Sequence, residues 1–153
     1  METIFTQIIN KKISSYIIYE DKTVVSFLDI NPFTKGHSLV VTKEEYSSII
    51  EIPEFIFVHL FSVVQKISKV LIKTFNAKGI NLLNNNGKIA GQTIFHYHVH
   101  LIPRFLPKEV DLVFNNNLKF DKSDYNKMCQ EIKINFKKMI IDKEDKNDFF
   151  YAK

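Results

Sequence analysis

Apolar residues and histidines alternate over one short stretch of the chain. Residues 94–103 read Ile-Phe-His-Tyr-His-Val-His-Leu-Ile-Pro. A period of two is typical of a β-strand, because successive side chains point to opposite faces of the sheet. We therefore expect a strand over residues 97–102, with the imidazoles of His96, His98 and His100 facing one spot.

The remaining hydrophobic pattern predicts helices and further strands. Apolar residues spaced three and four apart indicate helices over residues 2–11, 53–75 and 124–141, with Pro53 near the first turn of the longest one. Shorter apolar runs bounded by polar turns predict strands over residues 15–19, 23–28, 37–41 and 79–84. Residues 85–91 form a polar loop. This order predicts an α+β domain with a mostly antiparallel sheet.

Composition supports one globular domain. The chain has 153 residues, of which 45% are hydrophobic, and we expect a single domain over residues 1–142 followed by a charged tail over 143–153. We expect no apolar run to approach a membrane span, and the first residues lack the pattern of a signal peptide.

The charged residues and the cysteine content indicate the setting of the protein. A net charge of +4 without a dense basic patch makes nucleic-acid binding the weaker reading. One cysteine, Cys129, excludes an intrachain disulfide framework and favours a reducing cytoplasm.

The histidine row can do chemistry on phosphorus. Imidazole has an ordinary pKa near neutrality, so it can act as a nucleophile, as an acid or base, or as a metal ligand. The preceding loop, residues 84–93, offers amides, a hydroxyl and main-chain N–H groups suited to phosphate oxygens. We expect His98 to be the nucleophile, with one ring nitrogen donating to a main-chain carbonyl, and His96 and His100 to orient or polarise.

Other readings of these residues stay open. Two histidines spaced two apart on a strand can hold zinc, although no cysteine lies nearby and a third ligand would have to come from His37 or His59. We read His59, within the long helix, as structural or surface. Asp29 precedes Ile-Asn-Pro and could form a turn or accept hydrogen bonds from ribose hydroxyls.

The segment from Gly91 to Arg104 resembles the histidine triad (HIT) family, whose motif alternates three histidines with apolar residues. The similarity runs from about Thr3 to Arg104 and is greatest to the bacterial Hit-like and Hint branch. It implies a five-stranded antiparallel sheet with one long helix, a short N-terminal helix, and a homodimer with a continuous ten-stranded sheet. It also implies hydrolysis of purine nucleoside phosphoramidates or related nucleotides through a nucleotidyl-histidine intermediate on His98.

The resemblance also implies roles for individual side chains. Asn85, Gln92 and Thr93 would contact the α-phosphate, with His100 beside it. Asp29 would hold the ribose, and His37 would border the site. The base pocket would be lined by Phe5, Ile8, Phe27 and Ile30.

The sequence departs from the family at two places. Many bacterial relatives have a structural zinc site where this chain has Thr3, Thr6 and Glu45, so we expect no structural zinc. No cofactor is expected to be required, although magnesium could accompany a polyphosphate substrate. Residues 105–142 diverge, which leaves the identity of the leaving group open.

Two alternatives to a cytoplasmic hydrolase are a nucleotide-binding regulatory protein with little catalysis and a metal-binding protein.

Overall fold

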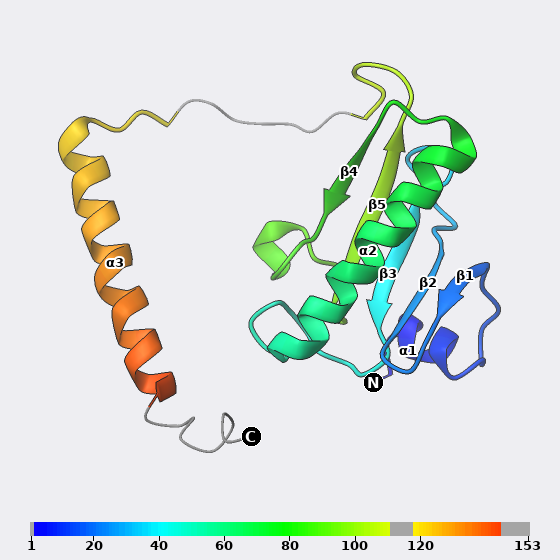
Figure 1. Cartoon of the computed structure of the whole chain (residues 1–153), viewed down its shortest axis with the longest axis horizontal. Helices are drawn as coiled ribbons and strands as arrows, with labels where there is room; N and C mark the ends of the chain where they lie inside the picture. Colours follow the sequence, from blue (N-terminus) through cyan, green and yellow to red (C-terminus); the bar gives the residue numbers. More distant parts are fainter. Residues whose placement is uncertain (1, 111–117, 145–153) are drawn as a thin grey trace. The chain divides into compact units, whose positions relative to one another are not determined.

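The computed structural model describes residues 2–110 and 118–144. The chain divides into two compact units, Met1–Asp111 and Leu112–Lys153, and each is described by itself (Figure 1). The division at residue 111 falls within the expected single domain over residues 1–142, which stays a prediction. In the described part of the second unit, α3 (Lys122–Glu144) is the one regular element. The expected tail over 143–153 lies outside the described residues from 145 onward.

The first unit contains a five-stranded antiparallel sheet with helices, which confirms the expected α+β fold. The elements are α1 (Ile4–Ile9), β1 (Ile17–Glu20), β2 (Val24–Leu28), β3 (Ser38–Thr42), α2 (Glu54–Phe75), β4 (Gly79–Leu83), a 3-10 helix η1 (Lys88–Ala90) and β5 (His98–Arg104). The strand order is β1-β2-β3-β5-β4, with every neighbouring pair antiparallel. The histidine strand β5 is therefore an inner strand of the sheet, paired on both sides.

Helix α2 covers one face of the sheet (Figure 1). Its inner side buries Leu60, Val64 and Leu71 in one cluster with Val99 and Leu101 of β5. By length and composition alone α2 could also cross a membrane, which corrects the expectation that no run approaches a span. Its 22 residues are long enough to meet that criterion, and its inner side is buried in the core cluster against the sheet.

The opposite face of the sheet packs against the short helix α1. Phe5 and Ile8 of α1 form a second buried cluster with Phe27 of β2 and with Leu39 and Val41 of β3. Residues 99 and 101 of β5 point to the α2 cluster, so the alternation places residues 98 and 100 on this α1 face.

The histidine strand begins later than the alternation indicated. The β3–β5 ladder starts at the pair Val41 and His98, and His96 lies before it. A main-chain hydrogen bond at Tyr97 explains the difference. Its N–H donates to the carbonyl of Tyr46 at 2.6 Å, and Tyr46 lies beyond the end of β3. The imidazole of His96 still reaches the α1 side, where the ring of Phe5 contacts it at a centroid distance of 5.9 Å.

Candidate functional site

A cavity of about 320 Å³ opens on the α1 face of the sheet, between α1, β2, β3 and β5. Eight of the residues expected in the site line it: Phe5, Ile8, Phe27, Asp29, Ile30, Thr93, His98 and His100. One end of the cavity is apolar and the other presents imidazoles and a carboxylate. Such a mixture suits a ligand with a flat apolar part and an anionic part.

The proton position on His98 follows from its hydrogen bond. His98 Nδ1 lies 2.6 Å from the main-chain oxygen of His96, and a carbonyl only accepts, so Nδ1 carries the proton. Nε2 then keeps its lone pair, and no group among residues 2–110 and 118–144 hydrogen-bonds to it. Burial lowers the pKa of His98, which keeps this ring neutral and nucleophilic near pH 7. The expected bond from the central histidine to a main-chain carbonyl is present.

His96 is fully buried and braces the site. Its Nε2 lies 2.6 Å from the carbonyl oxygen of Thr42, so Nε2 carries the proton and Nδ1 accepts. The hydroxyl of Thr3 lies 3.0 Å from that Nδ1. Thr3 is also the N-cap of α1, where its Oγ1 accepts from the N–H of Thr6. The start of α1 is thereby fixed to the residue whose carbonyl orients His98.

The donors around His96 do not fit a structural zinc ion. The hydroxyl of Thr6 lies 3.3 Å from His96 Nδ1 and donates to the carboxylate of Glu45 at 2.6 Å. Closed zinc sites use thiolate and imidazole ligands, whereas this cluster has two neutral hydroxyls, one carboxylate and one imidazole. Hydrogen bonds among these side chains satisfy the oxygen and nitrogen atoms that would otherwise be available as metal ligands.

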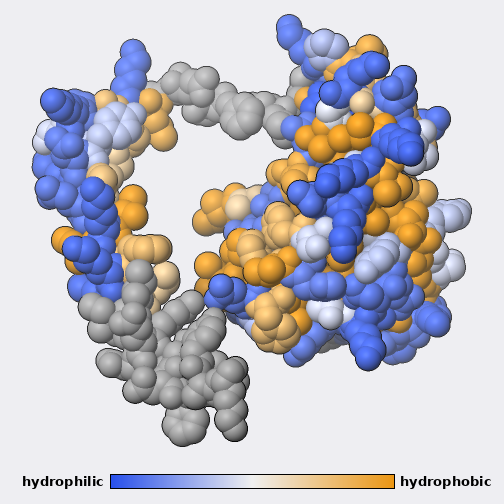
Figure 2. Space-filling view, viewed as in Figure 1, coloured by the Kyte–Doolittle hydropathy of each residue, from blue (hydrophilic) through white to orange (hydrophobic). Residues whose placement is uncertain are grey.

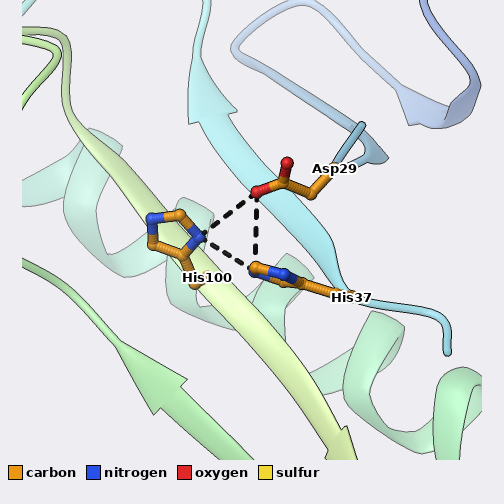
Figure 3. Close-up of side chains that lie close together, drawn as sticks. All are labelled: Asp29, His37 and His100. Atoms are coloured by element: carbon orange, nitrogen blue, oxygen red, sulfur yellow. Dashed lines mark hydrogen bonds and ion pairs between the residues drawn. The ribbon is translucent and has the colours of Figure 1, made fainter. Parts of the chain in front are cut away.

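Three side chains converge at the anionic end of the cavity, and Figure 3 shows them together. His37 Nε2 lies 3.0 Å from His100 Nδ1, and Asp29 Oδ2 lies 3.7 Å from the former and 3.8 Å from the latter. Burial lowers the pKa of His37, and burial together with the neighbouring His98 and His37 lowers the pKa of His100 to about 4. These three residues are close enough together to share one metal ion.

Asp29 fits both of its alternative readings. Its Oδ1 accepts from the N–H of Asn31 at 2.8 Å, which is the turn-forming role. The carboxylate also lines the cavity. His59 has the structural role expected for it, since its Nε2 lies 2.8 Å from the carboxylate of Asp21.

Gln92 does not present its side chain to the cavity. Its amide nitrogen donates to the carbonyls of Ser47 and Ile94, and its oxygen accepts from the N–H of Gly87. Both N–H donors are used in this structure, and the phosphate contact expected of this amide stays a prediction. Asn85 likewise donates to the carbonyl of Gly91, at 3.3 Å, and is not among the residues lining the cavity.

Sequence reasoning missed several residues that shape the site. Asn84 donates to the carbonyl of His98 at 2.7 Å, and Phe33 both stacks on His37 and donates its main-chain N–H to that ring. Leu39 and Ile94 line the cavity. Only Leu39 had a usable signal, because strand alternation from His37 places both residues on one face.

The fold and the site define a class of protein: a mixed α+β protein that presents a row of imidazoles to a small-molecule cavity. Comparison with known proteins narrows the class. The HIT domain matches residues 10–106. Protein hit of Bacillus subtilis is 44% identical over 102 residues, which are 67% of this chain and 70% of that protein. The adenosine 5'-monophosphoramidase HNT1 of Candida albicans is 38% identical over 105 residues, 66% of this chain and 69% of that protein.

A solved structure agrees with these matches. The crystal structure of a HIT family protein from Bacillus anthracis superposes with a TM-score of 0.80 at 39% identity, covering 87% of this chain and 96% of that one. The chain belongs to the HIT family. Family membership confirms the resemblance drawn from the histidine row.

Proposed function

We propose that this protein binds a purine nucleotide and hydrolyses it at the α-phosphate through a covalent intermediate on His98. One observation carries the proposal: the 2.6 Å bond from His98 Nδ1 to the carbonyl of His96 holds the proton on Nδ1 and frees Nε2 at the cavity. A buried neutral imidazole with a fixed tautomer is an activated nucleophile.

The reaction has two displacements at phosphorus. In the first, His98 Nε2 forms a bond to the α-phosphorus, and the bond from phosphorus to the leaving group breaks, with a proton going to the leaving atom. In the second, water forms the new P–O bond, the P–N bond to His98 breaks, and the mononucleotide departs. Splitting one difficult step into two is the general advantage of a covalent intermediate.

In this proposal the apolar end of the cavity binds the base, and the polar end binds the ribose and the phosphate. Phe5, Ile8 and Phe27 supply apolar walls for a purine, and Ile30 lies at the rim with 73% of its surface exposed. Asp29 accepts from ribose hydroxyls in this proposal. Thr93 and His100 donate to phosphate oxygens, since both line the cavity near His98.

We extend the proposal to metals, assembly and location. The nucleophile needs no metal for activation, and magnesium would accompany only a polyphosphate substrate. A homodimer would extend the sheet at the edge strand β4, beside outward apolar residues of α2 such as Phe55, Val58 and Val70. Figure 2 shows apolar side chains on the face of the first unit where α2 lies. The free, exposed thiol of Cys129 fits a reducing cytoplasm.

Hydrolysis assays test the function. Wild-type protein and the His98→Ala variant are compared on an adenosine 5'-phosphoramidate and on diadenosine tetraphosphate, with AMP affinity measured for both. Wild-type turnover with a loss of several orders of magnitude in the variant, at unchanged AMP affinity, supports the nucleophile. An adenylylated wild-type protein seen by mass spectrometry after acid-free quenching identifies the intermediate. AMP binding without any turnover would contradict the proposal and favour a regulatory protein.

A further inference from the structure

A continuous row of hydrogen bonds leads from the main chain to the cavity. The N–H of Phe33 donates to His37 Nδ1 at 3.1 Å, and His37 Nε2 lies 3.0 Å from His100 Nδ1. His37 is buried, with 1% of its surface exposed, and the ring of Phe33 stacks on it at an interplanar angle of 19°. Figure 3 shows the imidazole of His37, which precedes β3, beside the imidazole of His100 on β5.

The first bond of the row sets the direction of the others. A main-chain N–H only donates, so Nδ1 of His37 must be the nitrogen with the lone pair. In a neutral ring the proton is then on Nε2, from which it is donated to His100 Nδ1. His100 accepts at Nδ1 and therefore carries its own proton on Nε2. Both rings are neutral near pH 7 because burial lowers the pKa of each.

We propose that His37 is a positioning residue, which fixes His100 in the tautomer that offers its Nε2–H to a phosphoryl oxygen in the cavity. The inference rests on the proposed function for the identity of the ligand, whereas the tautomers themselves belong to the free protein. A neutral imidazole acts here as a hydrogen-bond donor to developing negative charge, and no bond to His37 forms or breaks.

A metal ion shared by Asp29, His37 and His100 is the competing interpretation. A point equidistant from three corners separated by 3.0, 3.7 and 3.8 Å lies about 2 Å from each, which is a zinc–ligand distance. Metal binding would, however, need the lone pair of His37 Nε2. A histidine ligand normally donates its other N–H to an acceptor, whereas Nδ1 of His37 accepts from Phe33. The hydrogen bond from Phe33 therefore favours the row of hydrogen bonds over a shared metal ion.

Two variants with side chains of nearly the same shape, His37→Gln and His37→Glu, test whether residue 37 must donate a hydrogen bond to His100. His37→Gln retains an N–H that can reach His100 Nδ1, whereas His37→Glu presents only an acceptor when ionised. We expect kcat of His37→Gln to stay within about fivefold of wild type, and kcat of His37→Glu to fall about 10²- to 10³-fold, the cost of losing one donor to the oxyanion. KM for the nucleotide should change less than kcat in both variants.

A spectroscopic signature distinguishes positioning from mere support of the fold. Long-range ¹H–¹⁵N spectra of the free protein report which ring nitrogen of His100 is protonated. We expect Nε2 in wild type and His37→Gln, and Nδ1 in His37→Glu. If His37→Glu does not fold, Phe33→Pro removes the N–H that orients His37, and Phe33→Ala is the matched control that also lacks the ring but retains the N–H.

Three results would overturn the inference. One is a proton on Nδ1 of His100 in the wild type. Another is an unchanged kcat in a folded His37→Glu variant. The third is stoichiometric Zn²⁺ binding to wild type that both Asp29→Asn and His37→Gln abolish. Wild type that has the expected tautomers but cleaves no nucleotide would instead contradict the proposed function, with the row of hydrogen bonds intact.

Discussion

The Nδ1 atom of His98 lies 2.6 Å from the main-chain oxygen of His96, two residues earlier. This short contact ties the proton position of one histidine to the main-chain position of its neighbour. The side chain of His96 is in turn held by Thr42 and Thr3. The proton position of His98 thus depends on side chains and main-chain groups that do not line the cavity.

Turnover should remain high in mildly acidic solution. Burial, the largest effect on His98, lowers its pKa below the ordinary 6.5, so the unprotonated nucleophile persists as the pH falls through that value. We expect kcat/KM for a phosphoramidate to be flat from pH 8 to below 6.5 and to decline only under more acidic conditions. A half-maximal rate above pH 6.5 would show that His98 does not have the environment described.

Stability should decline over the same acidic range because of His100. Its pKa is about 4 in the folded protein and 6.5 when unperturbed, so the unfolded chain binds the extra proton first. This contribution is fully present above pH 6.5 and is lost as the pH falls toward 4, by at most about 3 kcal/mol. Urea unfolding of wild type and His100→Gln at pH 7.5 and 5 measures it. Equal pH dependence in the two proteins would exclude His100 as the cause.

Removal of the Thr3 hydroxyl should reduce both stability and turnover. Thr3→Val retains the shape but loses the N-cap of α1 and the donor to His96, at a cost of about 1–2 kcal/mol. Thr74→Val is the matched control, because Thr74 is an exposed residue of α2. We expect the control to behave as wild type in chemical unfolding and in hydrolysis. If kcat of Thr3→Val equals that of wild type, the hydrogen bond from α1 to His96 is not needed for turnover.

Gly36→Ala should destabilise the turn that delivers His37. Gly36 has φ of +82°, and an added Cβ would lie 2.5 Å from the ring of Phe75. A left-handed backbone with a side chain costs about 1–3 kcal/mol before the overlap is counted. Gly79→Ala is the control, because a Cβ there meets nothing within 4 Å. Thermal unfolding should separate the two, and equal melting temperatures would contradict the geometry.

Asp29→Asn should weaken binding of ribonucleotides more than that of analogues without ribose hydroxyls. Asparagine retains the oxygen that accepts from Asn31 but removes the charge. We expect KM for an adenosine phosphoramidate to rise about 10-fold or more, as the loss of charged hydrogen bonds implies, with a much smaller effect on the 2',3'-dideoxy analogue. An equal effect on both substrates would mean that Asp29 acts on the turn alone.

Local periodicity was sufficient to predict the elements of the first unit. The strand and helix spacings, and the alternation around Val99 and Leu101, require only that each element bury one side. The same alternation predicted that His98 and His100 share a face. Asp29 was a candidate from its own sequence context, and the family resemblance added the apolar residues expected in the base pocket, which line the cavity.

Tertiary structure alone decided how those residues act. Sequence spacing cannot show that the carbonyl of Thr42 accepts a hydrogen bond from His96, that the N–H of Phe33 orients His37, or that Gln92 donates to the carbonyls of Ser47 and Ile94. These partners lie many residues apart or belong to the main chain, and hydrogen-bond direction depends on their final geometry. The alternation in the sequence determined that His98 and His100 meet at the cavity, and only the fold determined that His96 is buried beside it and where the proton of each ring lies.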